Sequence, residues 1–290
     1  MADGKINTSF FAKPTYINCS GRLFDLSKPA VAAILNLTPD SFYDGGKYTN
    51  EKQIIETINI FYESGAAIID VGAYSSRPGA EHISEENEWL RLDKVLDIIR
   101  REVPQLIISV DTFRAEIARK AKEYYDVSII NDISGGEMDA TMFETIAKLN
   151  LAYVLMHMQG TPQTMQLNPV YQSVTDEVIR YFHKKVFRLR QNGVNDIILD
   201  PGFGFGKNVE HNYELLDNLS KFRIFELPLM AGFSRKSMIQ KVLKTTAAQS
   251  LNGTTVLNTV ALQQGANILR VHDVKEAVEA IELVNMLKKK

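Results

Sequence analysis

The chain has 290 residues, which suits either one large barrel domain or two average domains. Apolar residues make up 45% and charged residues 23%, a balance typical of a globular protein with a sizeable core. The formal net charge of -2 gives no broad positive field, so we expect neither nucleic acid nor a membrane as a partner.

Cysteine use and hydropathy indicate the compartment. Cys19 is the single cysteine, which excludes an internal disulfide, and the sequence starts without a hydrophobic signal segment. Apolar runs stay far below the roughly 18 consecutive residues that a membrane span needs. These features together predict a cytoplasmic protein.

The first predicted element is a β-hairpin. Residues 1–13 carry little apolar pattern, and we expect them to form a flexible tail, with residues 14–290 as a single domain. Residues 15–27 alternate apolar and polar side chains around Ser20 and Gly21, as the two strands of a hairpin do. Such a hairpin could plug one end of a barrel.

Eight short apolar runs, rich in β-branched residues, follow the hairpin and alternate with segments of helical period. The runs lie at 30–36, 67–71, 107–111, 128–132, 153–157, 196–200, 228–232 and 268–272. Apolar stripes such as Val174, Val178 and Phe182 mark the helices between them. Eight strand-helix pairs without a linker favour an α/β fold, the (β/α)8 TIM barrel, over an open doubly wound sheet.

Nearly every apolar run ends, on its carboxyl side, in a residue that can bind polar ligand groups. In a (β/α)8 barrel these strand ends meet at one face, where the active sites of this fold lie. The residues are Asn36, Asp70, Asp111, Asn131, Asp132, His157, Asp200, Ser234, Arg235, Lys236, Arg270 and His272. We therefore expect side chains from both ends of the chain to line one cavity.

Several of these residues also have purely structural interpretations. Asp111 precedes a predicted helix and could simply cap it, while Asp200 begins an Asp-Pro-Gly turn. His157 fits a hydrogen-bonded core histidine, and Arg270 could pair with a neighbouring aspartate. The combined pattern favours function, because chance capping does not require eight strands to end in this way.

Glycine and basic residues indicate the chemical class of the ligand. The run DPGFGFGK at 200–207 follows a strand, where glycine lets the backbone approach a flat or phosphorylated ligand. The run GFSRKS at 232–237 precedes a helix, whose first amides with Arg235, Lys236 and Ser237 predict an anion site; a solvated basic helix start is the alternative. The residues thus predict a pocket for a small, flat, hydrogen-bonding ring that carries phosphate. No His/Cys pattern indicates zinc, and no nucleophile elbow indicates a serine hydrolase.

Eight motifs, in order, resemble those of the dihydropteroate synthase family. They are ILNLTPDSFYDGG at 34–46, SSRPGA at 75–80, SVDTFRAEIA at 109–118, NDISGG at 131–136, LMHMQGTP at 155–162, DPGFGFGK at 200–207, GFSRKS at 232–237 and RVHDV at 270–274. A chance match of all eight is not credible. The resemblance implies a sulfonamide-sensitive transferase of folate biosynthesis that joins a dihydropterin methyl diphosphate to p-aminobenzoate on a TIM barrel.

The resemblance also implies roles for the matching residues. The pterin diphosphate would be bound by Ser76, Asp111, Asn131, Met156, Asp200, Lys236, Arg270 and His272. Among these, Asp111, Lys236, Arg270 and His272 would act in catalysis, with Asp111 stabilising a pterin cation as pyrophosphate leaves. Asn36 would contribute to a Mg2+ site beside the diphosphate. The p-aminobenzoate would lie nearer the mouth, against Ser76, Arg77, Pro78, Phe205, Lys236 and Ser237.

Further implications concern loops, assembly and alternatives. The family implies a homodimer, and loops 37–50 and 73–83 would form mobile lids. The chain has GAYSSRPG where the family pattern is GGESTRPG, so Ala73 and Tyr74 replace a Gly-Glu pair and Ser76 replaces a threonine. Ser76 keeps the hydroxyl, whereas Tyr74 leaves the mouth of the aminobenzoate site open to question. The alternatives are a methyltetrahydrofolate:corrinoid-type methyltransferase, which would not need this loop, and a non-catalytic pterin-binding paralogue.

Overall fold

The computed structural model describes residues 15–37, 47–75, 82–165 and 169–288, and the statements below refer to these residues. Residues 1–13, for which we predicted a tail, lie outside them. The predicted lid loops lie largely outside them as well, apart from residues 73–75 and 82–83 and the ends of 37–50.

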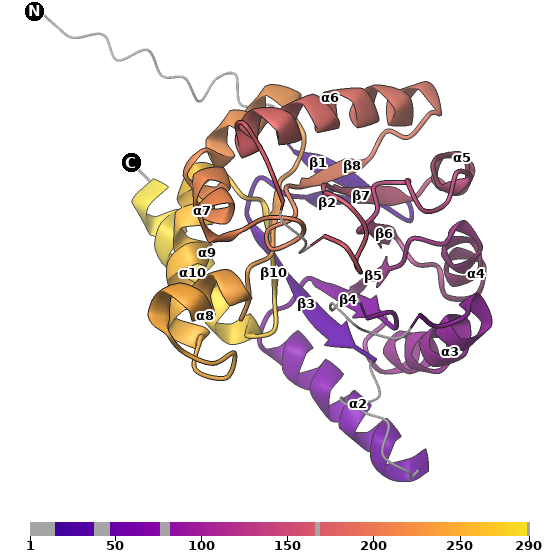
Figure 1. The fold of residues 1–290 in the computed structure, drawn as a ribbon. Helices are drawn as coiled ribbons and strands as arrows, with labels where there is room; N and C mark the ends of the chain where they lie inside the picture. The colour runs from indigo at the N-terminus through magenta and orange to yellow at the C-terminus, as the bar shows by residue number, and fades with distance from the viewer. Residues whose placement is uncertain (1–14, 38–46, 76–81, 166–168, 289–290) are drawn as a thin grey trace, which may run out of the picture.

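Eight parallel strands form the wall of the barrel, in the order β8-β7-β6-β5-β4-β3-β10-β9 (Figure 1). Their bounds are β3 Ala30–Asn36, β4 Ile68–Gly72, β5 Ile107–Asp111, β6 Ile129–Asp132, β7 Ala152–Met156, β8 Ile197–Asp200, β9 Met230–Ala231 and β10 Ile268–Val271. The ring closes where Leu199 and Leu229 form an isolated parallel bridge between β8 and β9. The predicted (β/α)8 barrel is confirmed, with each strand end within two residues of its predicted position.

Helices pack around the outside of the barrel (Figure 1). They are α2 Lys47–Glu63, α3 Glu85–Glu102, α4 Ala115–Tyr125, α5 Met142–Leu149, α6 Val174–Gln191, α7 Val209–Asp217, the 3-10 helix η2 Leu219–Phe225, α8 Ser237–Leu243, α9 Leu251–Gln264 and α10 Val274–Lys288. The predicted stripe on α6 is confirmed, since Val174, Val178 and Phe182 are fully buried. The simple strand-helix alternation changes after β9, where both α8 and α9 precede β10.

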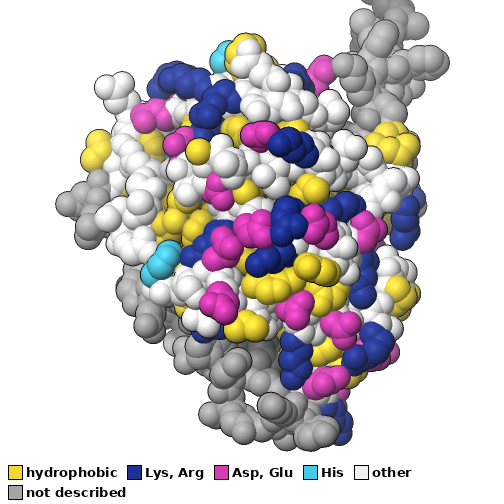
Figure 2. All heavy atoms as spheres, turned by 90° about the vertical axis from the view of Figure 1, so that its right-hand side faces the viewer, with side chains coloured by type: hydrophobic (Ala, Val, Ile, Leu, Met, Phe, Trp, Pro, Cys, Tyr) yellow, Lys and Arg dark blue, Asp and Glu magenta, His cyan; other side chains and the backbone are white. Residues whose placement is uncertain are grey.

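The face formed by α3, α4 and α5 carries charges of both signs. Figure 2 shows Lys and Arg side chains interspersed with Asp and Glu on this side. On α4, Arg119 pairs with Glu116 and Glu123, and on α5 Lys148 pairs with Glu144. This face therefore presents no one-sided positive field. No helix within the described ranges is long and apolar enough to cross a membrane.

The predicted hairpin is confirmed as β1 Tyr16–Cys19 and β2 Arg22–Asp25. Ser20 and Gly21 join the strands with φ angles of 53° and 85°, as a two-residue turn of the I′ kind requires. Ile17 and Cys19 pack with apolar residues inside the barrel. The Asn18 backbone N–H donates to the Asp196 carboxylate over 2.9 Å, just before β8 begins. The hairpin thus plugs the amino-terminal end, as predicted.

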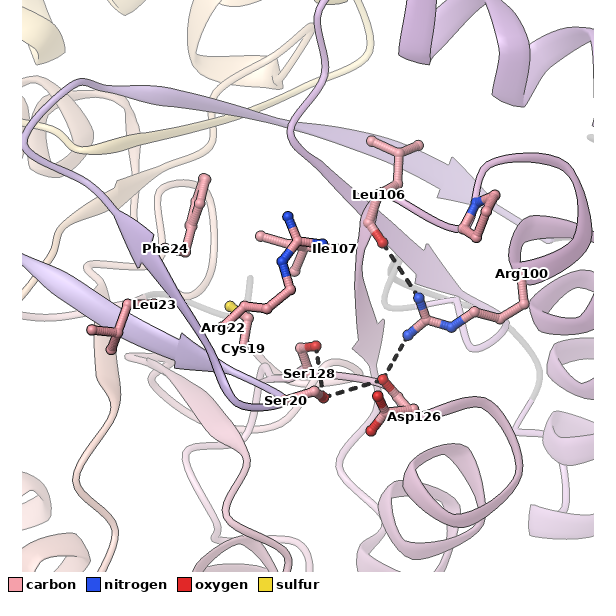
Figure 3. A pocket seen from close by; sticks show the side chains of 11 residues that line it. Cys19, Ser20, Arg22, Leu23, Phe24, Arg100, Leu106, Ile107, Asp126 and Ser128 are labelled. Atoms are coloured by element: carbon pink, nitrogen blue, oxygen red, sulfur yellow. Dashed lines mark hydrogen bonds between the residues drawn. The ribbon is translucent and has the colours of Figure 1, made fainter.

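A cavity of about 220 Å3 remains between the hairpin and the barrel (Figure 3). The Arg100 guanidinium at its edge donates to the carbonyls of Tyr125 and Asp126 over 2.5 and 2.6 Å. Burial, with the Asp196 carboxylate nearby, raises the pKa of Cys19 to about 12, so its thiol stays protonated. The hairpin and the Arg100 hydrogen bonds close this end of the barrel. Ligands would therefore enter from the opposite end.

Candidate active site

Inward-pointing side chains recur at every second residue of each strand, and they change from apolar to polar toward the carboxyl end. The pairs Ile68 and Asp70, Ile129 and Asn131, Ile198 and Asp200, and Ile268 and Arg270 follow this rule on β4, β6, β8 and β10. The register places Asn36, Gly72 and Asp111 side by side on β3, β4 and β5. A side chain at Gly72 would lie 3.3 Å from Asp111 Cβ and 3.7 Å from Asn36 Oδ1, so glycine leaves the space between them open.

Arg270 of β10 connects to β4 and β5 at the carboxyl ends of the strands. Its Nε donates to Asp70 over 2.6 Å, and its Nη2 donates to Asp111 over 2.8 Å. Burial lowers the pKa of Arg270, but the two carboxylates more than offset this and hold the pKa above its usual range. The expectation that Arg270 could pair with a neighbouring aspartate is therefore confirmed, with two partners.

Asp70 also organises the neighbouring strands. It accepts a hydrogen bond from Ser109 Oγ over 2.5 Å and another from Asn131 Nδ2 over 3.0 Å. These bonds orient the Asn131 side chain, whose Oδ1 is buried without a hydrogen-bond partner among the described residues. A buried acceptor of this kind is costly to leave unpaired, so it indicates where a ligand donor would bind.

The interpretation of Asp111-Thr112 as a helix cap is wrong for Asp111, which pairs with Arg270, whereas the Thr112 hydroxyl accepts from the Arg114 backbone N–H over 3.2 Å. The side chain that accepts from the Ala115 backbone N–H at the start of α4 is that of Asp139, over 2.8 Å. Burial raises the pKa of Asp111 to about 7, although the Arg270 guanidinium opposes the rise. The hydrogen bond from Arg270 Nη2 holds the Asp111 side chain in place.

Lys236 approaches the same cavity from the segment after β9. Its Nζ donates to the Phe203 carbonyl over 2.6 Å and lies 4.7 Å from the centre of the Phe205 ring. Burial lowers the pKa of Lys236 to about 8, while Asp200 opposes the fall. Burial likewise raises the pKa of Asp200, which the Lys236 charge counteracts. Lys236 and Arg270 therefore each lie within electrostatic reach of both Asp111 and Asp200, as the sequence predicted.

The segment 200–207 is fixed from within by Lys207. The Nζ of this buried lysine donates to the carbonyls of His157, Gly202 and Phe205 over 2.9 to 3.3 Å. Burial lowers its pKa to about 7. Gly202 is required here, because its φ is +72° and a Cβ would lie 1.9 Å from the His157 carbonyl oxygen. The Asp-Pro-Gly turn is also present, since Asp200 accepts from the Gly202 N–H over 2.8 Å.

His157 is a core histidine, as the structural interpretation held. It is buried, and its Nδ1 lies 3.0 Å from Lys207 Nζ. Since lysine only donates, Nδ1 is the accepting nitrogen. Burial and the Lys207 charge lower the pKa of His157 well below its usual range, so the ring is neutral.

The side chains of the predicted basic group at 235–237 point to different places. Arg235 turns away from the cavity and forms a bidentate ion pair with Asp273, which contradicts its place in the predicted anion site. Its φ of +56° is rare for a non-glycine residue and reverses the chain direction just before Lys236. Ser237 begins α8 and is exposed, and His272 lies exposed at the rim, with its backbone N–H donating to Ser234 Oγ over 3.2 Å.

Ser76, Arg77 and Pro78, which we predicted to contact p-aminobenzoate, lie outside the described residues. The other predicted residues lie at or after the carboxyl ends of strands, within the described residues. Met156 ends β7 opposite Asp200 of β8, and its Cγ would lie 3.3 Å from a side chain at Gly202.

Sequence reasoning assigned no role to three residues that support the site. Asp70 was noted only as a polar residue at a strand end, while Ser109 and Lys207 were read as parts of motifs. The period of two would have identified Asp70 and Ser109, which lie two residues before Gly72 and Asp111. No sequence signal distinguishes Lys207 from an exposed lysine after a glycine-rich loop.

Comparison with known proteins shows which family and which solved structures this chain resembles. The pterin binding enzyme family matches residues 32–272. A dihydropteroate synthase of Escherichia coli strain K12 is 45% identical over 266 residues, which are 91% of this chain and 93% of that protein. A solved Yersinia pestis dihydropteroate synthase with a sulfonamide drug has a TM-score of 0.87 at 39% identity, covering 94% of this chain and 99% of the other. A Xanthomonas albilineans dihydropteroate synthase with 4-aminobenzoic acid has a TM-score of 0.86 at 34% identity, with coverages of 96% and 100%.

The Arg270 ion pairs yield a prediction for stability. Replacing Asp70 with alanine should lower the free energy of unfolding by about 3–5 kcal/mol, because it removes one partner of a buried ion pair. Asp97→Ala is the matched control: its carboxylate is 63% exposed in a surface pair with Arg101, and the loss should stay below about 1 kcal/mol. Urea denaturation at pH 7 measures both, and equal losses would contradict the role given to Asp70.

Proposed function

Because the chain belongs to the pterin-binding enzymes and, among them, to the dihydropteroate synthases, we propose that the cavity at the carboxyl ends of the strands is where its two substrates are joined. The family predicted from the eight motifs is thereby confirmed. The chain is a transferase of folate synthesis, condensing a dihydropterin methyl diphosphate with p-aminobenzoate to give dihydropteroate and pyrophosphate. The residue assignments are supported by Lys236 and Arg270, each of which lies within electrostatic reach of Asp111 and Asp200.

The pterin ring is proposed to bind deepest, among Asp111, Asn131 and Asp200. A pterin offers a 2-amino group and ring N–H donors, which call for buried acceptors. Asn131 Oδ1 is such an acceptor, and the Asp200 carboxylate lies on the strand that pairs with β7. Each charged hydrogen bond contributes roughly 1.5–3 kcal/mol, and an unpaired carboxylate costs about as much, so rings without matching donors are rejected.

Two further side chains are proposed to contact the flat ring. Met156 is buried at the end of β7, where its thioether can pack against one edge. The planar Arg270 guanidinium is held in one orientation by Asp70 and Asp111, so its face is available for stacking.

The diphosphate is proposed to lie between Asn36, Arg270 and His272. Asn36 supplies an amide oxygen, a ligand type that suits Mg2+, and Mg2+ keeps several waters and takes phosphate oxygens as well. No group of three or more His, Cys, Asp or Glu side chains that could hold a metal occurs in the described part of the chain. A Mg2+ ion held by Asn36 and the substrate would help to neutralise the departing pyrophosphate.

The p-aminobenzoate is proposed to lie nearer the mouth, against Phe205, Lys236 and Ser237. The Lys236 ammonium lies over the Phe205 ring, which gives this subsite a cation beside an aromatic surface. Because α8 has only seven residues, the negative carboxylate would depend on Lys236 and the Ser237 amide more than on a helix dipole. Ser76, Arg77 and Pro78 stay predicted contacts.

Pyrophosphate is proposed to leave before the amine attacks. The C–O bond to the pterin methylene breaks with its electron pair on pyrophosphate, which leaves a pterin cation. Asp111 stabilises that cation because it is a fixed carboxylate beside the ring, and Arg270 and His272 balance the charge of the leaving group. The arylamine nitrogen then forms the new C–N bond and loses a proton.

The enzyme is proposed to be a cytoplasmic homodimer. Val256 of α9 and Leu283, Met286 and Leu287 of α10 are 53%, 71%, 62% and 66% exposed. The three α10 side chains share one helix face, and apolar side chains gathered in this way mark association surfaces. The buried free thiol of Cys19 fits a reducing compartment. Sedimentation should give a dimer mass; a monomer at micromolar concentration would contradict this assembly.

Activity itself is the first test. Purified protein with dihydropterin methyl diphosphate, p-aminobenzoate and Mg2+ should release pyrophosphate, and sulfonamides should compete with p-aminobenzoate. Chelation of Mg2+ should lower the rate, because the charge of the leaving group is then less well neutralised. Absence of pyrophosphate release would favour the non-catalytic paralogue. Methyl transfer from methyltetrahydrofolate to a corrinoid would favour the methyltransferase.

The Lys236 pKa gives a pH prediction. Below a pKa of about 8 the amine carries its charge, and above it the charge is lost, so kcat/KM for the pterin diphosphate should fall as pH rises through this value. Lys236→Met should lower kcat/KM at pH 7 by roughly 10- to 100-fold, as the loss of one charged hydrogen bond predicts, and should remove the alkaline decline. A decline that persists in this variant would assign it to another group, with Lys207 the next to test.

A further inference from the structure

A buried lysine of segment 200–207 has no part in the proposed reaction. Lys207 is 3% exposed, and its Nζ lies 2.9 to 3.3 Å from the carbonyl oxygens of His157, Gly202 and Phe205 and 3.0 Å from His157 Nδ1. An ammonium has three N–H donors and no acceptor, so these contacts use all of its donors. Lys207 thereby joins the loop after β7 to the loop after β8, the strand that pairs with β7.

The backbone that carries the Phe205 ring has little conformational preference of its own. Phe205 lies between Gly204 and Gly206, whose φ angles are +83° and +61°. Glycine adopts such angles without strain, but it loses more conformational freedom on folding than other residues and has no side chain to pack. The position of the Phe205 ring therefore depends on the hydrogen bonds that hold this backbone.

Side chains from different segments bond to the backbone of residues 204–206. Lys207 Nζ donates to the Phe205 carbonyl over 3.0 Å, and the Tyr171 hydroxyl donates to the carbonyl of residue 206 over 2.8 Å. The N–H of residue 204 donates to Asn212 Oδ1 over 2.7 Å. Of these three side chains only Lys207 is cationic, and a hydrogen bond to a charged group contributes more than a neutral one. Lys207 is therefore the strongest of these partners.

The same backbone contacts the Lys236 side chain. Lys236 Nζ donates to the Phe203 carbonyl over 2.6 Å and lies 4.7 Å from the centre of the Phe205 ring. A Cβ at Gly204 would lie 3.3 Å from Lys236 Cδ. The carbonyls of residues 202 and 205 thus bind one lysine, and the carbonyl of residue 203 binds the other. A displaced Phe205 would therefore change both the aromatic surface and the surroundings of the cation that are proposed to receive p-aminobenzoate.

We propose that Lys207 is a positioning residue for the arylamine substrate: its ammonium holds the Phe205 backbone, so that the Phe205 ring stays against Lys236 where p-aminobenzoate is proposed to bind. This inference rests on the proposed function, which assigns Phe205 and Lys236 to that substrate. The pterin side depends on Lys207 less. Burial raises the pKa of Asp200, and Lys236 and Arg270 counteract this rise more than Lys207 does.

Lys207→Met tests this role, because methionine is also a long, unbranched side chain but has no N–H donor. The KM for p-aminobenzoate should rise by about three- to tenfold, which corresponds to one net hydrogen bond, while the KM for the pterin diphosphate stays within about twofold. The assay is run below the Lys207 pKa of about 7, where the wild-type amine carries its charge. Lys207→Gln keeps two N–H donors and should give an intermediate KM, and it replaces Lys207→Met if the loss of all donors prevents folding.

Lys185→Met is the matched control. Lys185 of α6 is also buried, and its Nζ donates to the Gly135 carbonyl over 2.8 Å. Its loss should lower Tm, as the loss of Lys207 should, but leave the KM for p-aminobenzoate within about twofold of the wild-type value. An equal rise of that KM in both variants would indicate a general loosening of the barrel and would overturn the proposal.

A double-variant cycle tests whether Lys207 acts through the Phe205 ring. Phe205→Leu should itself raise the KM for p-aminobenzoate, and adding Lys207→Met should raise it no further, because the ring that Lys207 positions is already absent. Fully additive effects would refute the role, and so would an unchanged KM in the Lys207 variants. A wild-type protein that releases no pyrophosphate would instead refute the proposed function, on which this inference rests.

Discussion

The site depends on keeping one guanidinium, that of Arg270, inside the barrel between Asp70 and Asp111. Such a charge is stable there only with carboxylate partners, because removing it from water costs several kcal/mol. The barrel supplies the partners from β4 and β5, although β3 lies between them and β10. Ala32 of β3 stands opposite Arg270 in the register, and its small side chain leaves room for the long arginine to cross.

The buried carboxylates and cations at this end of the barrel suit a polar, charged ligand. Burial raises the pKa of Asp111 and of Asp200 and lowers that of Lys236, while neighbouring opposite charges counteract each of these shifts. Groups balanced in this way gain most from a ligand that supplies matching donors and anions at fixed positions. In the proposed function, a pterin with a diphosphate would provide N–H donors for the carboxylates and negative charge for the cations.

The sequence predicted the strands and the rim residues because both depend on local patterns. Runs of β-branched residues mark strands, and a barrel brings their ends together whatever their separation along the chain. Side-chain partners were harder to predict. Arg235 and Arg270 both lie near strand ends, yet a positive φ turns Arg235 toward Asp273, while strand alternation turns Arg270 inward. Lys207 escaped notice because its role depends on three carbonyls that a sequence pattern does not reveal.

The two halves of the site are held by interactions of different strength. This difference affects which substitutions each half tolerates. The strand ends carry buried side chains, and segment 200–207 is held by Lys207 and by a glycine that admits no side chain. The loops at the mouth are joined by exposed hydrogen bonds, such as that between Tyr74 and Gln163, each of which contributes less. A substitution in the buried half leaves a charge or an acceptor unpaired, whereas at the mouth another acceptor can serve.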